Sequence, residues 1–98
     1  MIALLNGNIA SVTLNGDVTI DVNGVGYKVS MPERETINLR AGNAITVFVH
    51  TQVREDSIVL FGFIESSSKE LFEKLISVSG IGGKLALVML SVLSAQGI

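Results

Sequence analysis

Residues 17–31 read DVTIDVNGVGYKVSM, and this stretch decides the fold of the first two-thirds of the chain. Apolar and polar residues alternate over 18–22, which is the period of a strand with one buried face. Asn23-Gly24 follows, and this pair favours a tight hairpin turn because both central positions of that turn need positive φ. The alternation then resumes over 25–31. The stretch therefore predicts two antiparallel strands joined by a two-residue turn.

Three more strands are expected around this hairpin, each bounded by turn residues. Gly7 is expected to bend or bulge the first strand, and Pro32, the only proline, ends the third. Strands linked by tight turns, with no helical crossover, favour a small closed barrel, because closure leaves no exposed edge. The expected fold is an OB-like five-stranded barrel. Its strands run from about Ile2 to Thr13, over 18–22, over 25–31, over 45–49, and from Ser57 to Phe63.

The pattern changes to a helical period at Glu65. Ser67-Ser68-Lys69-Glu70 matches a capping box, in which a serine and a glutamate each satisfy a free backbone N–H at a helix start. Gly80 is expected to end this helix, and a second helix follows from about Gly83 to Ser94. The residues on the apolar face of the first helix are Leu71, Phe72, Leu75 and Ile76.

The second expected helix is apolar nearly all round, so it must be covered on more than one side. One preceding helix is too little cover for it. We therefore expect either that the chain is a truncated piece of a longer one or that a partner subunit supplies the missing cover.

Composition limits the classes of function. The chain has 98 residues, 48% hydrophobic and 16% charged, so a buried core is expected. The absence of cysteine excludes disulfides and thiolate nucleophiles. No signal peptide and no membrane span is visible, so the expected location is the cytoplasm. The net charge is −2 and the seven Lys and Arg are scattered, so any nucleic-acid binding must be local or completed by residues outside the chain.

An active site complete within the chain is not expected. His50 is the only histidine, and it lies on a predicted strand without the orienting partner that catalysis needs, so a surface or packing role is the better interpretation. Acids at Asp17 and Asp21, or at Glu33 and Glu35, stand where turns and solvated strands commonly place them. No Walker loop, nucleophile elbow or metal-binding cluster is present in the sequence. The sequence therefore predicts a non-catalytic protein without a cofactor or metal.

A glycine-rich turn, Ser79-Gly80-Ile81-Gly82-Gly83-Lys84, joins the two expected helices. Its glycines leave backbone N–H groups unobstructed, and the helix start carries a partial positive charge of about half an elementary unit. Ile81 is expected to point inward, and Lys84 to add a full charge. The turn is typical of a helix-hairpin-helix motif, which holds DNA by its backbone. The alternative is an ordinary helix–helix turn with glycine caps and a solvated lysine.

An acidic tip, Arg54-Glu55-Asp56, lies between the last two expected strands. Its simplest interpretation is a solvated hairpin tip. Next to DNA its meaning changes, because carboxylates repel phosphates and would separate strands rather than bind them.

These motifs together resemble the RuvA family, the Holliday-junction-binding subunits of the bacterial branch-migration complex. The resemblance spans the chain in register, and it is the separation of the motifs that makes it specific. They are Met1-Ile2 with Gly7, Gly24-Val25-Gly26-Tyr27, Val53-Arg54-Glu55-Asp56, Leu60-Phe61-Gly62-Phe63, Leu71-Phe72 and Gly80 to Ala86. One departure is Gly83, where the family pattern has a proline-type residue.

The resemblance implies a division of the chain and a set of partners. Residues 1–64 would form the OB-like barrel, with tetramer contacts and an acidic pin at Glu55 and Asp56. Residues 65–98 would form the first part of a helix-hairpin-helix domain that binds DNA phosphate through Ser79 to Lys84. The family forms homotetramers, or two tetramers face to face, on four-way junction DNA, and recruits the RuvB motor in recombination and repair. The second hairpin motif and the RuvB-binding domain are expected to lie outside this chain.

Two other functions stay open on the residues alone. One is a general single-strand binder, which would stack bases on aromatic side chains of the barrel. The other is an oligomerisation module, supported by the apolar second helix.

Overall fold

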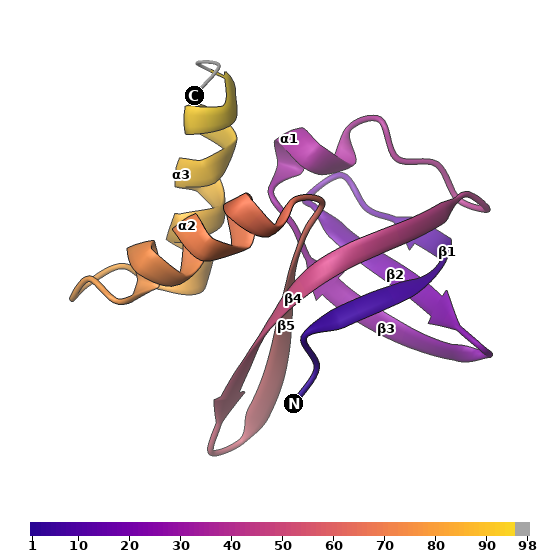
Figure 1. Cartoon of the computed structure of the whole chain (residues 1–98), viewed down its shortest axis with the longest axis horizontal. Coiled ribbons are helices and arrows are strands. Elements are labelled where there is room, and N and C mark those ends of the chain that lie inside the picture. The colour runs from indigo at the N-terminus through magenta and orange to yellow at the C-terminus, as the bar shows by residue number, and fades with distance from the viewer. Residues whose placement is uncertain (96–98) are drawn as a thin grey trace.

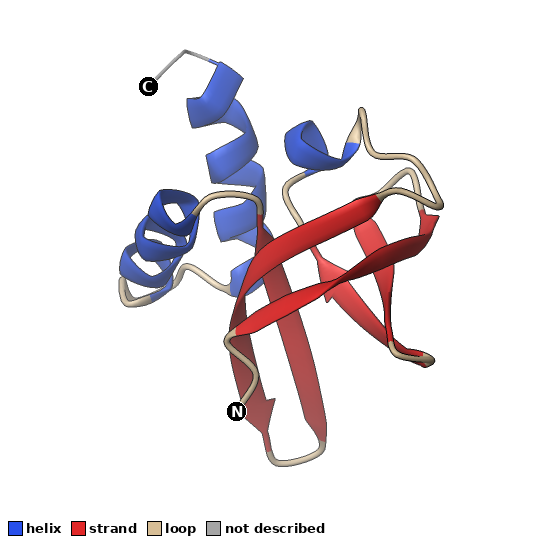
Figure 2. Cartoon of the chain, turned by 45° about the vertical axis from the view of Figure 1, so that its right-hand side comes forward, coloured by secondary structure: helices blue, strands red, loops and turns tan. Residues whose placement is uncertain are grey.

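The computed structural model describes residues 1–95, so the last three residues of the expected segment 65–98 lie outside the described part. A barrel of five strands carries two longer helices on one side (Figures 1 and 2). In chain order the elements are β1 (Leu4–Val12), β2 (Asp17–Val22), β3 (Val25–Ser30), α1 (Glu33–Thr36), β4 (Ala44–Arg54), β5 (Ser57–Phe63), α2 (Ser66–Ile76) and α3 (Gly83–Ala95).

The strands close in the order β1-β2-β3-β5-β4, which confirms the expected five-stranded OB-like barrel. β1 pairs antiparallel with both β2 and β4, β2 with β3, and β4 with β5. The barrel is closed by a short parallel contact between β3 and β5, at Val29 with Leu60 and Ser30 with Phe61. The hairpin turn is as predicted, with positive φ at Asn23 and Gly24.

The barrel interior is filled by aliphatic side chains from every strand. Their alternation along the strands is what the sequence pattern predicts, since every second side chain faces inward. The buried members are Leu5, Ile9, Val18, Ile20, Val29, Met31, Ile45, Val47, Val49 and Leu60.

β5 belongs to two cores at once. Leu60 faces the barrel interior, whereas Phe61 and Phe63 belong to a second cluster with Phe72 of α2 and with α3. Gly62 lies against Val29 and Met31, where an added Cβ would meet side-chain atoms at 3.3–3.4 Å. The Phe-Gly-Phe motif therefore places two rings under the helices and a glycine against the barrel packing.

Two expectations about the barrel were wrong. The register shift in β1 lies between Ile9 and Ser11, not at Gly7. Gly7 instead permits a close approach, because an added Cβ would collide with the Asp21 carbonyl of the next strand. The connection from β3 to β4 is also not free of helix, since it contains α1. A four-residue helix is too short to show a helical period in the sequence.

The capping box predicted at Ser67 is absent. α2 begins at Ser66, with Glu65 in extended conformation at the cap position and no side-chain cap bond. The Glu65 carbonyl accepts the N–H groups of Ser68 and Lys69, at 3.2 and 3.4 Å, which places Ser67 inside the first turn. Just upstream, the Glu35 carboxylate accepts the Ile64 N–H at 2.9 Å in the link between β5 and α2.

The ends of α2 and α3 refine the other expectations. α2 ends at Ile76 rather than at Gly80, which lies in the following turn with φ of +89°. α3 buries Ala86 and Leu90 but leaves a stripe of apolar residues exposed, which confirms that α2 alone does not cover it. The stripe consists of Leu85, Val88 and Val92. Within residues 1–95, no helix is long and apolar enough to cross a membrane.

Candidate nucleic-acid interface

The turn between α2 and α3 has the backbone that an anion site needs. Ser79, Gly80 and Gly82 are exposed, and an added Cβ at Gly80 or Gly82 would meet no atom within 4 Å. Ile81 packs into the cluster of Phe61 and Phe72, as predicted, and its N–H donates to the Val78 carbonyl at 3.1 Å. The turn is thus pinned from inside and open on its outer face.

The start of α3 has N–H groups that no helical carbonyl accepts. The first helical bond runs from the Ala86 N–H to the Gly82 carbonyl, at 3.0 Å. The N–H groups of Gly83, Lys84 and Leu85 therefore come before any helical acceptor, and they carry the positive end of the helix dipole. Lys84 is exposed and makes no ion pair with a described side chain. An anion placed at the helix start would meet these N–H groups.

Gly83 has a packing reason that sequence reasoning missed. Its Cα lies so close to the Phe61 ring that an added Cβ would overlap the ring atoms. Gly83 is buried, and Phe61 is only 3% exposed. The first turn of α3 is therefore pressed directly onto β5, which fixes this end of the glycine-rich turn to the barrel.

The second candidate element is a hairpin arm formed by the outer parts of β4 and β5, residues 52–59. β1 pairs with β4 only as far as Phe48, and β3 pairs with β5 only at Leu60 and Phe61, so the arm projects beyond the barrel (Figure 1). Glu55 and Asp56 form its two-residue turn, between the paired Arg54 and Ser57.

The tip of the arm carries two adjacent negative charges. Glu55 and Asp56 are exposed and adjacent, and neither makes an ion pair with a described side chain. Like charges 4 Å apart in water repel by about 1 kcal/mol, so the tip disfavours phosphate at close range. Behind it, Val53 and Ile58 face each other across the arm and are 65% and 69% exposed.

The structure keeps the two candidate elements apart. The chain leaves α2 at the end away from the barrel and returns to the start of α3, whereas the arm tip forms a separate projection (Figure 1). An anionic ligand that met both would have to be extended and would have to place its phosphates at the turn and not at the tip.

Comparison with known proteins identifies the family of this chain. Residues 1–62 match the family described as RuvA N terminal domain. The chain belongs to this family. The matched residues are the barrel almost to its end, including the arm and its acidic tip.

Relatives extend the similarity into the helices. Proteins named Holliday junction branch migration complex subunit RuvA are similar to 93–96% of this chain. The one from Synechococcus elongatus is 46% identical and that from Paramagnetospirillum magneticum 47%, each over 96% of this chain. That from Geobacter sulfurreducens is 49% identical over 93%. The chain spans about half the length of these family members, between 44% and 47%.

Asp17, Asp21 and His50 make local structural contacts. Asp21 accepts the Gly24 N–H at 2.7 Å in the hairpin turn, and Asp17 accepts the Ser30 hydroxyl at 3.1 Å. His50 packs beside Phe72, as a packing role predicts. Within residues 1–95, no three His, Asp or Glu side chains gather as a metal site.

The aromatic side chains do not form an exposed stacking platform. All five lie in the described part of the chain, and none is exposed. Tyr27 and Phe48 are half-buried, and the three others are buried in the cluster under the helices. This arrangement speaks against the single-strand binder, which needs aromatic faces open to bases.

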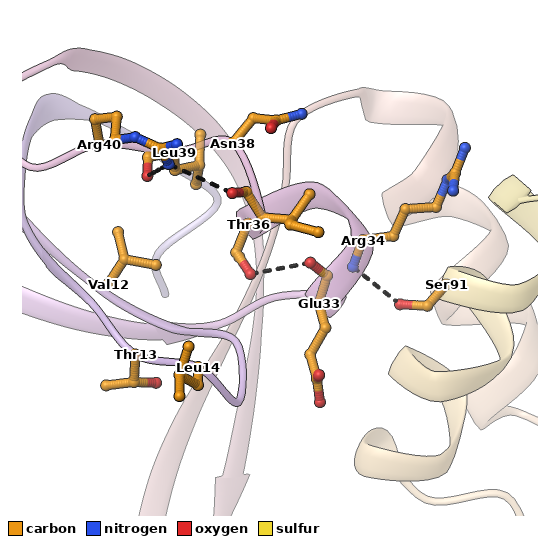
Figure 3. A pocket seen from close by; sticks show the side chains of 11 residues that line it. Val12, Thr13, Leu14, Glu33, Arg34, Thr36, Asn38, Leu39, Arg40 and Ser91 are labelled. Carbon is orange, nitrogen blue, oxygen red and sulfur yellow. Dashed lines mark hydrogen bonds between the residues drawn. The ribbon is translucent and has the colours of Figure 1, made fainter.

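An open hollow of about 760 Å³ lies between α1, the β1–β2 turn and α3 (Figure 3). The Arg34 backbone N–H reaches the Ser91 hydroxyl at 3.4 Å across it, and the Arg40 guanidinium donates to the Leu39 carbonyl at 3.0 Å. These contacts tie α1 to α3 and to its own loop. They bring together no nucleophile, base and orienting group, so the hollow offers no catalytic set.

Glu35 is half-buried, which its interpretation from the sequence as an ordinary solvated acid did not foresee. Burial raises the pKa of its carboxyl above the ordinary 4.5, and the nearby Glu65 raises it further, although the Ile64 N–H bond counters part of the rise. The sequence signal was only an acid two residues into a short helix, so its contact with Ile64, 29 positions away, could not be read from local pattern.

Proposed function

We propose that this chain is the DNA-binding part of a Holliday junction branch migration complex subunit, a non-catalytic scaffold that holds a four-way junction. One observation carries the proposal: a glycine turn at a helix start and a hairpin tipped by two carboxylates stand on one framework in a member of the RuvA N-terminal family. The printed role of the relatives supports it. ATP-driven branch migration, in recombination and repair, would belong to a RuvB motor.

The turn from Ser79 to Lys84 would grip a DNA phosphate. Its support is the open outer face, the three N–H groups that precede the first helical acceptor, and the exposed Lys84. Such contacts give affinity and register but read no bases. Because each neutralised phosphate releases counterions, the grip makes binding salt-dependent.

Glu55 and Asp56 would act as an acidic pin. A pin that repels phosphates disfavours a continuous duplex across the arm and tolerates a point where strands part. The projection of the arm beyond the barrel supports this role, since a tip level with the barrel surface could not enter a junction. The turn would therefore supply affinity and the pin would supply selectivity.

Assembly as a homotetramer, or as two tetramers face to face, would match one subunit to each arm of the junction. Closed cyclic symmetry is the common route to such a ring. We assign tetramer contacts and the pin to the barrel, residues 1–64, and the grip to the helical segment, residues 65–98. The exposed stripe of α3 needs cover from a partner or from further chain. Contact with the motor would use a part of the family's chain outside these residues.

The test is a binding competition with the full-length product of the gene that encodes this chain. At one fixed salt concentration, a four-way junction should bind at least about tenfold more tightly than a linear duplex of the same sequence. Specific DNA binding exceeds non-specific binding by at least roughly this factor. Equal affinities for the two DNAs would refute the proposed function. A preference for single strands over both would favour the barrel-face binder instead.

A further inference from the structure

The arm and the helical turn are joined through one polar contact. His50 lies on β4, four residues before the end of the strand at Arg54, and Glu73 lies on α2, which leads into the turn. The His50 Nδ1 and the Glu73 Oε2 are 2.9 Å apart. Each candidate DNA element therefore continues directly from one side of this contact.

The surroundings make the contact directional. The His50 side chain is 23% exposed, and its ring centroid lies 5.5 Å from that of the fully buried Phe72, tilted by 59°. Phe72 in turn lies 4.9 Å from both Phe61 and Phe63 of β5. The rings pack α2 onto the barrel, and the Gly83–Phe61 contact holds the far side of the turn, so a polar bond from α2 to β4 is a further constraint on how α2 is rotated. A hydrogen bond to a carboxylate is directional, so it can fix that rotation.

We propose that His50 and Glu73 are positioning residues that set the orientation of the phosphate-gripping turn relative to the acidic pin. The inference rests on the proposed function of those two elements. A partly exposed pair of this kind adds little to stability. Its effect is therefore expected in the geometry of the two elements and in junction binding, and not in the melting temperature.

Spin labels test the geometry on this chain itself. The sequence has no cysteine, so Ser57→Cys on the arm and Val78→Cys after α2 give two unique and exposed attachment points. Samples are diluted with unlabelled chain so that only distances within one copy are measured. The distance distribution should be narrow in the parent and should broaden or shift with Glu73→Ala and with His50→Ala. Glu70→Ala, which removes the same charge from an exposed position on the same helix, should leave it unchanged.

Junction binding by the full-length product tests the consequence. Glu73→Ala should weaken four-way junction binding roughly threefold to tenfold and leave linear duplex binding unchanged, and the double variant with His50→Ala should be no weaker than the poorer single variant. Glu73→Gln keeps an oxygen and should retain most of the affinity. An unchanged distance distribution, or a changed one with full junction affinity, would overturn the positioning role alone. Equal binding of junction and duplex by the unmodified protein would overturn the proposed function, and the positioning role with it.

Discussion

At the scale of single residues, two glycines of one turn do different work. Gly82 faces open space, whereas the Cα of Gly83 rests on the Phe61 ring. In the sequence the two were equivalent, and Gly83 stood out only as a departure from a proline-type residue. Its side-chain-free contact is what allows α3 to begin so close to β5.

Gly83→Ala should therefore destabilise the fold. Overpacking of a filled core costs about 1–3 kcal/mol, and the better helix propensity of alanine offsets at most about 1 kcal/mol. The melting temperature should fall by several degrees in a thermal unfolding experiment, since about 1 kcal/mol corresponds to roughly 4–8 °C in a domain of this size. Gly82→Ala is the matched control and should have little effect. Equal stability of the two variants would show that the Phe61 contact is not tight.

Glu35 gives a prediction about pH. Because its folded pKa is raised above 4.5, the folded state holds the proton more strongly than the unfolded state. The resulting stabilisation is complete below about 4.5 and is lost as pH rises through the folded pKa. Glu35→Gln keeps an oxygen for the Ile64 N–H and removes the charge, so it should match or exceed the parent in unfolding free energy at pH 7.

The measurement is denaturant unfolding of parent and Glu35→Gln between pH 4 and pH 7. The advantage of the glutamine variant should grow as pH rises across the window above 4.5. Glu35→Ala serves as the control for the hydrogen bond, and it should be about 1 kcal/mol less stable than Glu35→Gln at every pH, because Ile64 then lacks its acceptor. A glutamine variant whose advantage shrinks with rising pH would contradict the sign of the shift.

At the scale of elements, local pattern explains what could be predicted. The structure confirmed the two strands predicted from the alternation over 17–31, and it confirmed the bounds Ser57–Phe63 of β5. Such strands are predictable because apolar and polar residues alternate along a strand with one buried face. The pinning of the turn by Ile81 was also predictable from an apolar residue between glycines. The turn itself and the tip were found from their residues, although their roles rest on the proposal.

The elements that could not be predicted depend on distant contacts. α1 has four residues, and its Glu35 acts on a link 29 positions away. α2 also begins at Ser66, so the serine that the sequence predicts as its cap lies inside the first turn. The partner of His50 could not be seen either, since Glu73 lies on a different element 23 positions along the chain. These features could not be predicted because the contacting residues lie far apart in the sequence, and not because their secondary-structure propensities are ambiguous.

At the scale of the whole molecule, the proposed function assigns DNA affinity to the turn and selectivity for the junction to the arm. The turn is held to β5 by Phe61 and Gly83, and the arm is an extension of the same sheet, so the two elements share one framework. In a closed ring of such subunits, phosphates would be held around the outside and carboxylates would meet where strands part. The chain spans about half the length of the relatives.

The most direct test compares junction and linear duplex affinity at fixed salt for the unmodified full-length product, Lys84→Ala, and Glu55→Gln with Asp56→Asn. Lys84→Ala should weaken the binding of both DNAs by a similar factor. It should also lower the slope of log affinity against log salt concentration by about one phosphate contact for each turn that binds. The neutralised tip should bind duplex more tightly and junction at least as tightly, so that the ratio of the two affinities falls. A ratio changed by Lys84→Ala and unchanged by the neutralised tip would contradict the account.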